Sequence, residues 1–378
     1  MLWVYILTVI GITLQLFLPS LKHTNQYTNY NNYIIFKNSF FHLIHNQDLY
    51  KYYNNEQFDL YKYSPSFALL FGLLGYLPDV IGLLAWGLVN AICLFQAIKM
   101  LNGITDKKKI LLLLFILLEL INALQNSQSN AYMAGLIITA FVFLEKRSYF
   151  WASLFIVFSI YIKLFGVVAF ALYLFYPDKI KLATYTIFWM VVLAILPLCV
   201  ISPTQLVFLY KSWWALLKDD HTASVGISAM SIVNSWLHAE LPKNLVVAIG
   251  AILFLIPFAR VKLYQDYHFK IQILASVLLW MVLFNHKAES PTFIITMAGI
   301  GIWYFSQEKT TVNTVLLWLS LLGVSLSVSD LVPKNIKTDY LQPYSVKALL
   351  PLVIWLKLLW DLMVRKSNKS VLVPKVSQ

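Results

Sequence analysis

The chain has 378 residues, of which 60% are hydrophobic and only 12% are charged, and its mean hydropathy is +0.70. A soluble domain holds roughly a quarter charged residues, so this composition excludes a soluble globular protein. The net charge of +12 could suit nucleic acid, but the sequence has no basic nucleic-acid module, and positively charged cytoplasmic loops explain it better. Cys93 and Cys199 both lie inside apolar runs, which argues against a disulfide framework and a cysteine metal site.

Apolar runs of about 17–25 residues recur along the chain, and this is the length that crosses a hydrocarbon core of about 30 Å. The first span is expected at 1–19 and is expected to be retained, since neither a basic leader nor a cleavage site marks a signal peptide. A polar, Tyr- and Asn-rich loop follows over 20–64, and then a short apolar piece at 66–77. Further spans are expected near 80–98, 110–125, 131–145, 149–161, 164–176, 182–201, 244–259, 271–284, 292–305, 312–328 and 347–364.

The basic residues predict the orientation. The arginines Arg147, Arg260 and Arg365 each stand in a short joint or tail that also holds lysine. The run 107–109 and the joint "PDKIK" fall on the same side if the spans alternate, and this side is expected to be cytoplasmic. The 66–77 piece then becomes a re-entrant helix between Pro65 and Pro78. We therefore predict an all-α polytopic membrane protein with about 12 transmembrane helices and both termini in the cytoplasm. Residues 1–366 form one integral domain, and 367–378 form a cytoplasmic tail.

The remaining polar elements share the opposite, outer face. They are the 20–64 loop, "QNSQSN" at 125–130, Lys163 in "YIKLFG", the 202–243 loop, and "NHKAESP" at 285–291. Charges at the ends of spans, rather than at the bilayer midplane, favour a binding or reaction site at the outer membrane surface.

Each of these residues also has a simpler interpretation. Lys163 and Lys287 could extend toward lipid phosphates, and His286 could bind a backbone carbonyl at a helix end. The loop aromatics could form an interfacial belt, and residues 219–221 fit a solvated turn. Glu119 lies inside a span, where an idle carboxylate is costly, so a functional role or a lysine partner is favoured.

Several segments resemble glycosyltransferase family 87 (the DUF2029 group). The family pattern has a loop ending in "DLY", then a "Y-x-Y-S-P" turn into an apolar segment that ends in Leu-Pro. The matching residues are Asp48-Leu49-Tyr50, Tyr61-Lys62-Tyr63-Ser64-Pro65 and Leu77-Pro78. "NSQSNAYMAGLI" is similar to the family's "GQ-x-N" element, "YIKLFGVVAFALYLF" to its Lys-x-x-Pro helix with Gly166 in place of proline, and "NHKAESPTF" to its "SP" turn. The similarity extends over about the first 305 residues.

The resemblance implies a GT-C-like fold with a long first extracytoplasmic loop and an active site that faces outward from the cytoplasmic membrane. It implies transfer of a hexose, often mannose, from a polyprenyl-phosphate donor to a lipid or glycan acceptor. The residues agree with this, because no Asp-x-Asp motif for a nucleotide sugar is present and a lipid donor needs a lateral opening between helices. No cofactor and no metal site are expected. The expected partners are the lipid-linked donor, the acceptor and membrane lipids, and not nucleic acid.

An inverting transfer needs a carboxylate that accepts the proton of the attacking hydroxyl, and positive charge that stabilises the departing phosphate. Lys163, His286 and Lys287 suit the phosphate, because lysine serves phosphate as a compact point charge. The other side chains expected to line the site are Asn31, Asn32, Lys62, Tyr63, Glu119, Gln128, Asn130 and Glu289.

The base is where the sequence departs from the family pattern. Members carry an Asp shortly after the first span, but this chain has "YNNYIIF" there, and the amides of Asn31 and Asn32 cannot act as a general base. Another acid of the loop must then take the proton. Asp59 is preferred because it lies just before the turn at Pro65, and Glu56 comes second, whereas Asp48 suits a loop-stabilising role.

Two other classes of function stay open at this point. A transporter or flippase of a lipid-linked sugar usually has related halves with paired broken helices, and these are not evident here. A catalytically inactive relative that binds glycolipid is compatible with Asn31 and Asn32.

Overall fold

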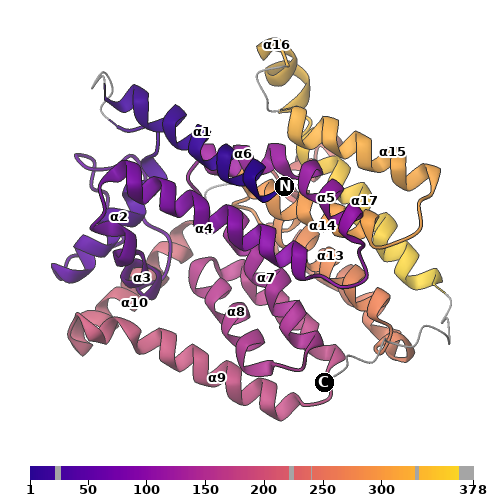
Figure 1. Cartoon of the computed structure of the whole chain (residues 1–378), viewed down its shortest axis with the longest axis horizontal. Coiled ribbons are helices and arrows are strands. Elements are labelled where there is room, and N and C mark those ends of the chain that lie inside the picture. Colours follow the sequence, from indigo (N-terminus) through magenta and orange to yellow (C-terminus); the bar gives the residue numbers. More distant parts are fainter. Residues whose placement is uncertain (22–26, 221–224, 240, 328–331, 366–378) are drawn as a thin grey trace.

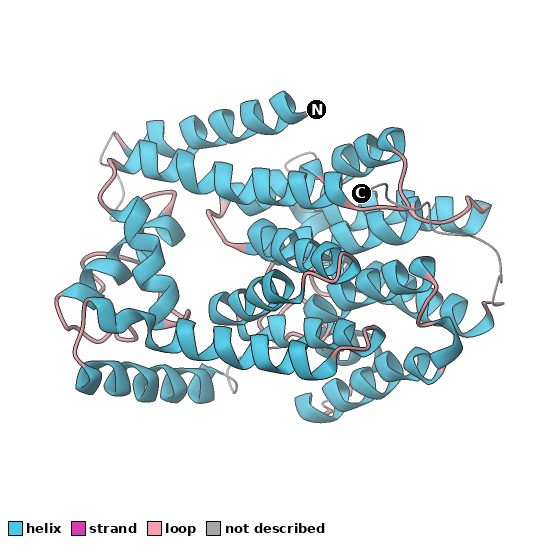
Figure 2. Cartoon of the chain, turned by 60° about the horizontal axis from the view of Figure 1, so that its bottom comes forward, coloured by secondary structure: helices cyan, strands magenta, loops and turns pink. Residues whose placement is uncertain are grey.

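The computed structural model describes residues 1–21, 27–220, 225–239, 241–327 and 332–365. In these residues every regular element is a helix (Figure 2). The predicted tail at 367–378 and His221 of the predicted solvated turn lie outside the described residues, and Asp219 and Asp220 of that turn instead end the helix Pro203–Asp220. The all-α class is therefore confirmed for the described chain.

The helices of the first half are α1 (Leu2–Ser20), α2 (Asn31–Ile44), α3 (Pro65–Gly75), α4 (Asp79–Met100), α5 (Asp106–Phe115), α6 (Leu117–Gln125), α7 (Asn130–Glu145), α8 (Tyr149–Ile162) and the 3-10 helix η1 (Leu164–Phe175). Those of the second half are α9 (Lys179–Ile195), η2 (Leu196–Cys199), α10 (Pro203–Asp220), α11 (Ala229–Leu237), α12 (Lys243–Leu255), η3 (Ile256–Ala259), η4 (Val261–Leu263), α13 (Tyr267–Leu283), η5 (Ser290–Thr292), α14 (Phe293–Phe305), α15 (Thr311–Ser320), the π-helical η6 (Leu321–Leu326), α16 (Lys334–Ile336), the π-helical η7 (Lys337–Leu341) and α17 (Val346–Val364).

The centre of the molecule is built from α7, α13 and α14, whose residues are almost all buried. Helix α9 lies along the edge (Figure 1) and exposes Ile180 by 84% and Ile187 by 61%. Such an apolar outer surface suits lipid tails and would be unfavourable in water. The burial pattern is therefore that of a membrane protein whose apolar outer helices enclose a packed core.

In the part of the chain that the structure describes, three helices are long and apolar enough to cross a membrane, namely Leu2–Ser20, Asp79–Met100 and Lys179–Cys199. Shorter apolar helices occupy most of the other predicted spans, for example Asn130–Glu145 and Tyr149–Ile162. The number of crossings stays a prediction.

Helix α3 occupies the predicted re-entrant piece. Pro65 stands in its first turn, and the Ser64 side chain caps the helix by accepting a hydrogen bond from the Phe67 N–H at 3.1 Å. Proline fits this first turn because its missing N–H would be unpaired there in any case. The same sequence, "SPSF", thus sets both the start of α3 and the direction of the loop before it.

Two expected loops contain helices. The 20–64 segment holds α2, and the 202–243 segment holds α10 and α11. In α2 the apolar side chains Tyr33, Phe36, Phe40 and Leu43 recur at helical spacing and are buried. Burial of this stripe stabilises a helix even though the segment is polar on average. The sequence did not predict that these expected loops contain helices.

The basic joints meet at one end of the molecule. Lys108 donates to the Gln307 carbonyl, the Tyr267 hydroxyl to the Asn102 carbonyl, and Lys270 pairs with Glu145 at 2.5 Å. The Arg260 guanidinium also donates to backbone carbonyls of residues 362, 363 and 365. We call the joints at 100–109, 145–148, 259–270, 306–309 and 362–365 the basic end.

The basic end carries the first testable prediction, which concerns orientation. We expect a reporter fused after Lys109 or after Arg147 to be active in the cytoplasm, and a tag inserted next to Asn54 to be accessible from outside the cell. The reason is that Lys and Arg are retained on the cytoplasmic side of short loops. Protease or labelling accessibility in intact cells measures this, and the reverse pattern would contradict an outward-facing site.

Candidate active site

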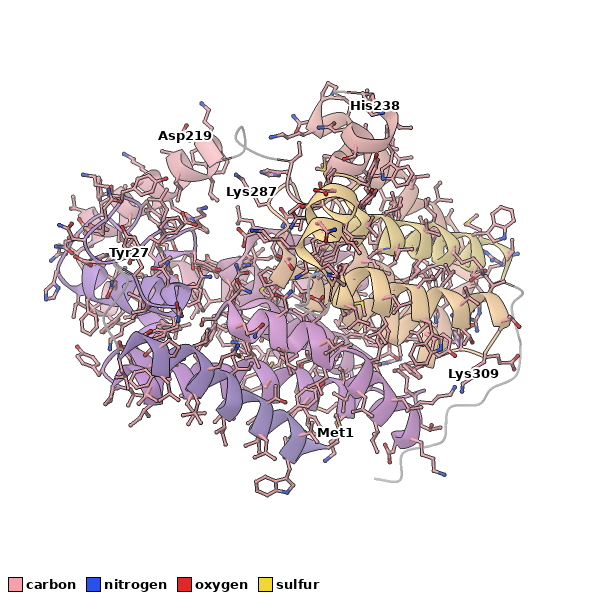
Figure 3. The ribbon with its side chains drawn as sticks, turned by 90° about the horizontal axis from the view of Figure 1, so that it is seen from above. Met1, Tyr27, Asp219, His238, Lys287 and Lys309 are labelled. Carbon is pink, nitrogen blue, oxygen red and sulfur yellow. The ribbon has the colours of Figure 1, made fainter. Side chains whose placement is uncertain are left out.

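Helices α7, α8 and α13 run from the basic end to the opposite end of the molecule. Glu145, Tyr149 and Tyr267 are at the basic end, so Asn130, Lys163 and the joint after α13 are at the other end. Figure 3 shows the same division, because Asp219, Lys287 and His238 lie on one side and Met1 and Lys309 on the opposite side. The predicted site residues therefore come from segments that the fold directs to one end, which we call the site end.

Lys163 stands between α8 and η1 in an extended conformation. Gly166 permits this sharp reversal, because a Cβ at that position would lie 2.9 Å from the backbone of Ser159. The Lys163 ammonium donates to Asn130 Oδ1 at 2.7 Å and, more weakly, to Gln128 Oε1 at 3.5 Å. It also lies 5.8 Å from the ring centre of Tyr63. Lys163 is thus held among polar and aromatic partners and does not extend toward lipid.

The side chains around Lys163 form a chain of hydrogen bonds. Asn130 Nδ2 donates to Gln128 Oε1 at 2.6 Å, and Gln128 Nε2 donates to Glu289 Oε2 at 2.7 Å. Burial lowers the pKa of Lys163 to about 8, while the Glu289 carboxylate raises it and Lys62 lowers it further. A lysine of this kind keeps most of its charge at neutral pH and has lost most of its water, which suits an anion.

The charges of two carboxylates, Glu289 and Asp59, act on Tyr63. Burial raises the pKa of Tyr63, and the Glu289 and Asp59 carboxylates add to the rise. Asp59 accepts from the Leu60 N–H at 2.7 Å and from Lys62 at 3.5 Å, and its side chain is 46% exposed. Asp59 is therefore open to a molecule that arrives from the aqueous side.

The joint "NHKAESP" between α13 and η5 contributes Glu289 directly. Asn285 Oδ1 accepts from the Lys287 N–H at 2.9 Å, and Thr292 Oγ1 accepts from the Glu289 N–H at 3.2 Å, so the joint is a compact turn. The segment after α10 packs on it, since the Ile227 N–H donates to the Ala288 carbonyl at 2.7 Å. Figure 3 shows Lys287 between the end of α10 at Asp219 and the helices of the C-terminal part.

Glu119 is fully buried and has the lysine partner that the sequence favoured. That partner is Lys347 of α17, whose Nζ lies 2.9 Å from Glu119 Oε1. Asn122 Nδ2 donates to Glu119 Oε2 at 3.1 Å, and both Asn122 and Lys347 donate to Ser290 Oγ at 3.0 Å. The sequence singled out neither Lys347 nor Ser290 as a site residue.

Asn31 and Asn32 fix the loop to the turn after α6. Asn32 donates to the Asn126 carbonyl at 2.8 Å, and Asn31 Oδ1 accepts from the Phe58 N–H at 2.9 Å. These two amides hold the 56–64 loop in place, which is a structural task.

The acids of the loop separate into different environments. Glu56 Oε2 lies 2.9 Å from His42 Nε2, and His42 is about three turns along α2 from Asn31. No hydrogen bond within the described residues connects Glu56 to Lys163. Asp48 accepts from Ser212 and from the Tyr50 N–H, as expected of a loop-stabilising residue. Of the three acids, Asp59 is the one next to Tyr63 and Lys62.

The comparison with curated proteins gives no match. Residues 61–285 match the family model described as glycosyltransferase family 87, and this is more than half of the 378 residues. The matched region includes Tyr63, Lys163 and Gln128. Together with the apolar helices it indicates a membrane glycosyltransferase, an enzyme with a sugar donor and an acceptor. The chain belongs to glycosyltransferase family 87, as its motifs predicted.

Proposed function

We propose that the protein transfers a hexose, with mannose as the expected sugar, from a polyprenyl-phosphate donor to a lipid or glycan acceptor at the outer face of the cytoplasmic membrane. The observation that carries this proposal is Lys163, a desolvated ammonium that Asn130 and Gln128 hold at the site end. A desolvated ammonium beside apolar helices suits a phosphate whose other substituent is a lipid chain.

The proposed reaction is a single displacement. The acceptor hydroxyl oxygen forms a bond to the anomeric carbon while the bond from that carbon to the phosphate oxygen breaks. Polyprenyl phosphate leaves with the bonding electrons, and Lys163, assisted by His286 and Lys287, stabilises its negative charge. Asp59 accepts the hydroxyl proton.

The other side chains prepare these groups. Glu289 accepts from Gln128, which directs the Gln128 carbonyl oxygen toward Asn130 and Lys163. Tyr63 provides the ring under the Lys163 ammonium, a contact that favours the cation. Lys62 lies 3.5 Å from the Asp59 carboxylate and orients it within the loop.

Donor specificity tests this function. Purified protein in liposomes is given a labelled polyprenyl-phosphate hexose or the corresponding nucleotide sugar, together with glycolipid and glycan acceptors. We expect labelled product and free polyprenyl phosphate from the lipid donor and no product from the nucleotide sugar. Transfer from the nucleotide sugar alone would contradict the proposal. Movement of the lipid donor across the bilayer without transfer would support the transporter alternative.

Gly226 provides a prediction about the joint that carries His286 and Glu289. Its φ is +55°, and a Cβ there would lie 2.7 Å from the His286 carbonyl oxygen and 2.8 Å from that of Ala288. We expect Gly226→Ala to displace the joint and to lower transfer per folded molecule by about 10- to 100-fold, since misplacement by about 1 Å has such effects.

Gly103→Ala is the matched control. Gly103 also has a positive φ, of +72°, and a Cβ there would contact the Tyr267 ring at 2.7 Å, but it lies at the basic end. We expect this variant to lower the amount of folded protein and to leave transfer per molecule unchanged. Equal losses of specific activity in both variants would mean that Gly226 acts only on folding.

A further inference from the structure

A buried ion pair contacts Ser290, the residue that follows Glu289 of the predicted site. The side chains of Lys347 and Glu119 are only 5% and 0% exposed, and their charged atoms are 2.9 Å apart. Lys347 is in the first turn of α17, which begins at Val346. The 61–285 match to the family does not include it.

Helix stability does not explain a lysine at this position. The amino-terminal turn of a helix carries a partial positive charge, which disfavours a second cation there. Burial of two charges removes their hydration, so a buried pair is often no more stabilising than apolar side chains of the same size. Ionisable residues inside the apolar part of a membrane protein are therefore expected to have a task other than stability.

The contacts of the pair point to that task. Lys347 Nζ donates to Ser290 Oγ at 3.0 Å, and Asn122, which also binds Glu119, donates to the same oxygen. Ser290 directly follows Glu289, whose carboxylate accepts from Gln128 and through it reaches Lys163. The ion pair thus holds Ser290, and the neighbouring Glu289 binds Gln128, which contacts the Lys163 ammonium.

Asn122, which binds Glu119, is also connected by hydrogen bonds to the loop that contains the proposed base Asp59. Asn126 Nδ2 donates to the Asn122 carbonyl at 2.8 Å, and Asn32 donates to the Asn126 carbonyl at 2.8 Å. Asn31 then binds the Phe58 N–H, one residue before Asp59. The groups assigned to the phosphate and to the proton are therefore both connected to Glu119 and Lys347.

We infer that Lys347 is a positioning residue of the transfer reaction, which acts with Glu119 through Ser290 to hold Glu289, and through Glu289 and Gln128 the Lys163 ammonium, in place for the donor phosphate. This inference rests on the proposed function. Lys347 itself does not contact the reacting atoms.

The test compares three variants with wild type in proteoliposomes supplied with labelled polyprenyl-phosphate hexose. Lys347→Met removes the charge and keeps the length, Lys347→Arg keeps a cation, and Ser290→Ala removes the shared acceptor while leaving the ion pair intact. Lys357→Met is the matched control, because Lys357 is on the same helix and pairs at 2.6 Å with Asp361, far from the site end. The measurements are the amount of folded protein, kcat, and the dependence of kcat/KM on pH.

We expect Lys347→Met and Ser290→Ala to lower kcat by about 10- to 100-fold, as the loss of a buried hydrogen bond with a charged partner would. Lys347→Arg is expected to recover part of the activity, and Lys357→Met to match wild type. The alkaline fall in kcat/KM should move to lower pH in Ser290→Ala. Among the groups that act on Lys163, the Glu289 carboxylate raises its pKa and the Lys62 ammonium lowers it. Displacement of Glu289 therefore lowers the pKa of Lys163, and its ammonium loses its proton at a lower pH.

A purely structural ion pair gives a different pattern. Lys347→Met would then reduce only the amount of folded protein, and Ser290→Ala would keep both the kcat and the pH profile of wild type. That result would overturn the inference and leave the proposed function intact. If wild type itself makes no product from the lipid donor, the proposed function fails first. Should Lys347→Met not fold, Ser290→Ala alone decides, because it leaves the Glu119–Lys347 pair in place.

Discussion

Asp59→Asn should abolish transfer while the protein still binds its donor. The amide keeps the volume and the hydrogen-bonding ability of the side chain but cannot accept a proton from the acceptor hydroxyl. A general base contributes about 10²- to 10⁴-fold to a rate, and we expect a loss of kcat in this range. The measurement is transfer from a labelled polyprenyl-phosphate hexose by purified variant protein, with donor binding measured in parallel.

Glu56→Gln is the comparison for Asp59→Asn. Glu56 is paired with His42, so we expect this variant to retain most of the transfer activity. If Asp59→Asn transfers normally and Glu56→Gln is inactive, the base is Glu56. If both variants transfer at the wild-type rate, the base lies outside this loop segment, and Glu289 becomes the next carboxylate to test because it contacts Gln128 beside Lys163.

Lys163→Ala is expected to have the second large effect. Loss of a preorganised charge contact to a developing oxyanion costs about 2.7–4 kcal/mol, which corresponds to about 10²- to 10³-fold in kcat. His286→Ala should also reduce transfer far more than it reduces the amount of protein. Lys181→Ala is the control, because Lys181 lies in the joint "PDKIK" and pairs with Asp178 at 3.7 Å. Unchanged transfer in both site variants would leave Lys163 with only a structural role beside Asn130 and His286 with a role at a helix end.

The pKa of Lys163 predicts how transfer depends on pH. Burial lowers this pKa to about 8, so the ammonium is charged below about pH 8 and becomes neutral as the pH rises above it. Phosphate binds the charged form, and therefore kcat/KM should fall on the alkaline side of about pH 8. Lys163→Arg should lose this alkaline fall even if it transfers slowly, because arginine stays protonated at these pH values. An alkaline fall that is identical in wild type and Lys163→Arg would assign it to another group.

The sequence alone was sufficient to predict the helical class. It also predicted that several polar segments lie at the same end of the molecule. The apolar runs are long, and basic residues mark one set of joints, so alternate ends of the helices become distinguishable. The contact of Lys163 with Gln128 and Asn130 follows from this, because "QNSQSN" and "YIKLFG" stand at helix ends of the same kind. The local sequence is therefore sufficient to place a residue when its location depends only on which end of its own helix it occupies.

The partner of Glu119 could not be identified from the sequence. Lys347 is 228 residues away, and its position depends on how α17 packs against the rest of the molecule. The contact of Glu56 with His42 could not be predicted for a related reason. This contact requires α2, which lies in a segment that the sequence predicted only as a polar loop. Pairings between distant segments are set by packing, which local composition does not reveal.

Binding of polyprenyl phosphate tests the central claim most directly, because it isolates the phosphate from the transfer step. The dissociation constant is measured for purified protein in lipid nanodiscs, for wild type, Lys163→Ala and Asp59→Asn, at pH 6.5 and pH 9. We expect tight binding by wild type at pH 6.5, weaker binding at pH 9, and unchanged binding by Asp59→Asn. Lys163→Ala should bind weakly at both pH values. Equal binding by wild type and Lys163→Ala would contradict the assignment of the site end as the place where the lipid-linked phosphate is held.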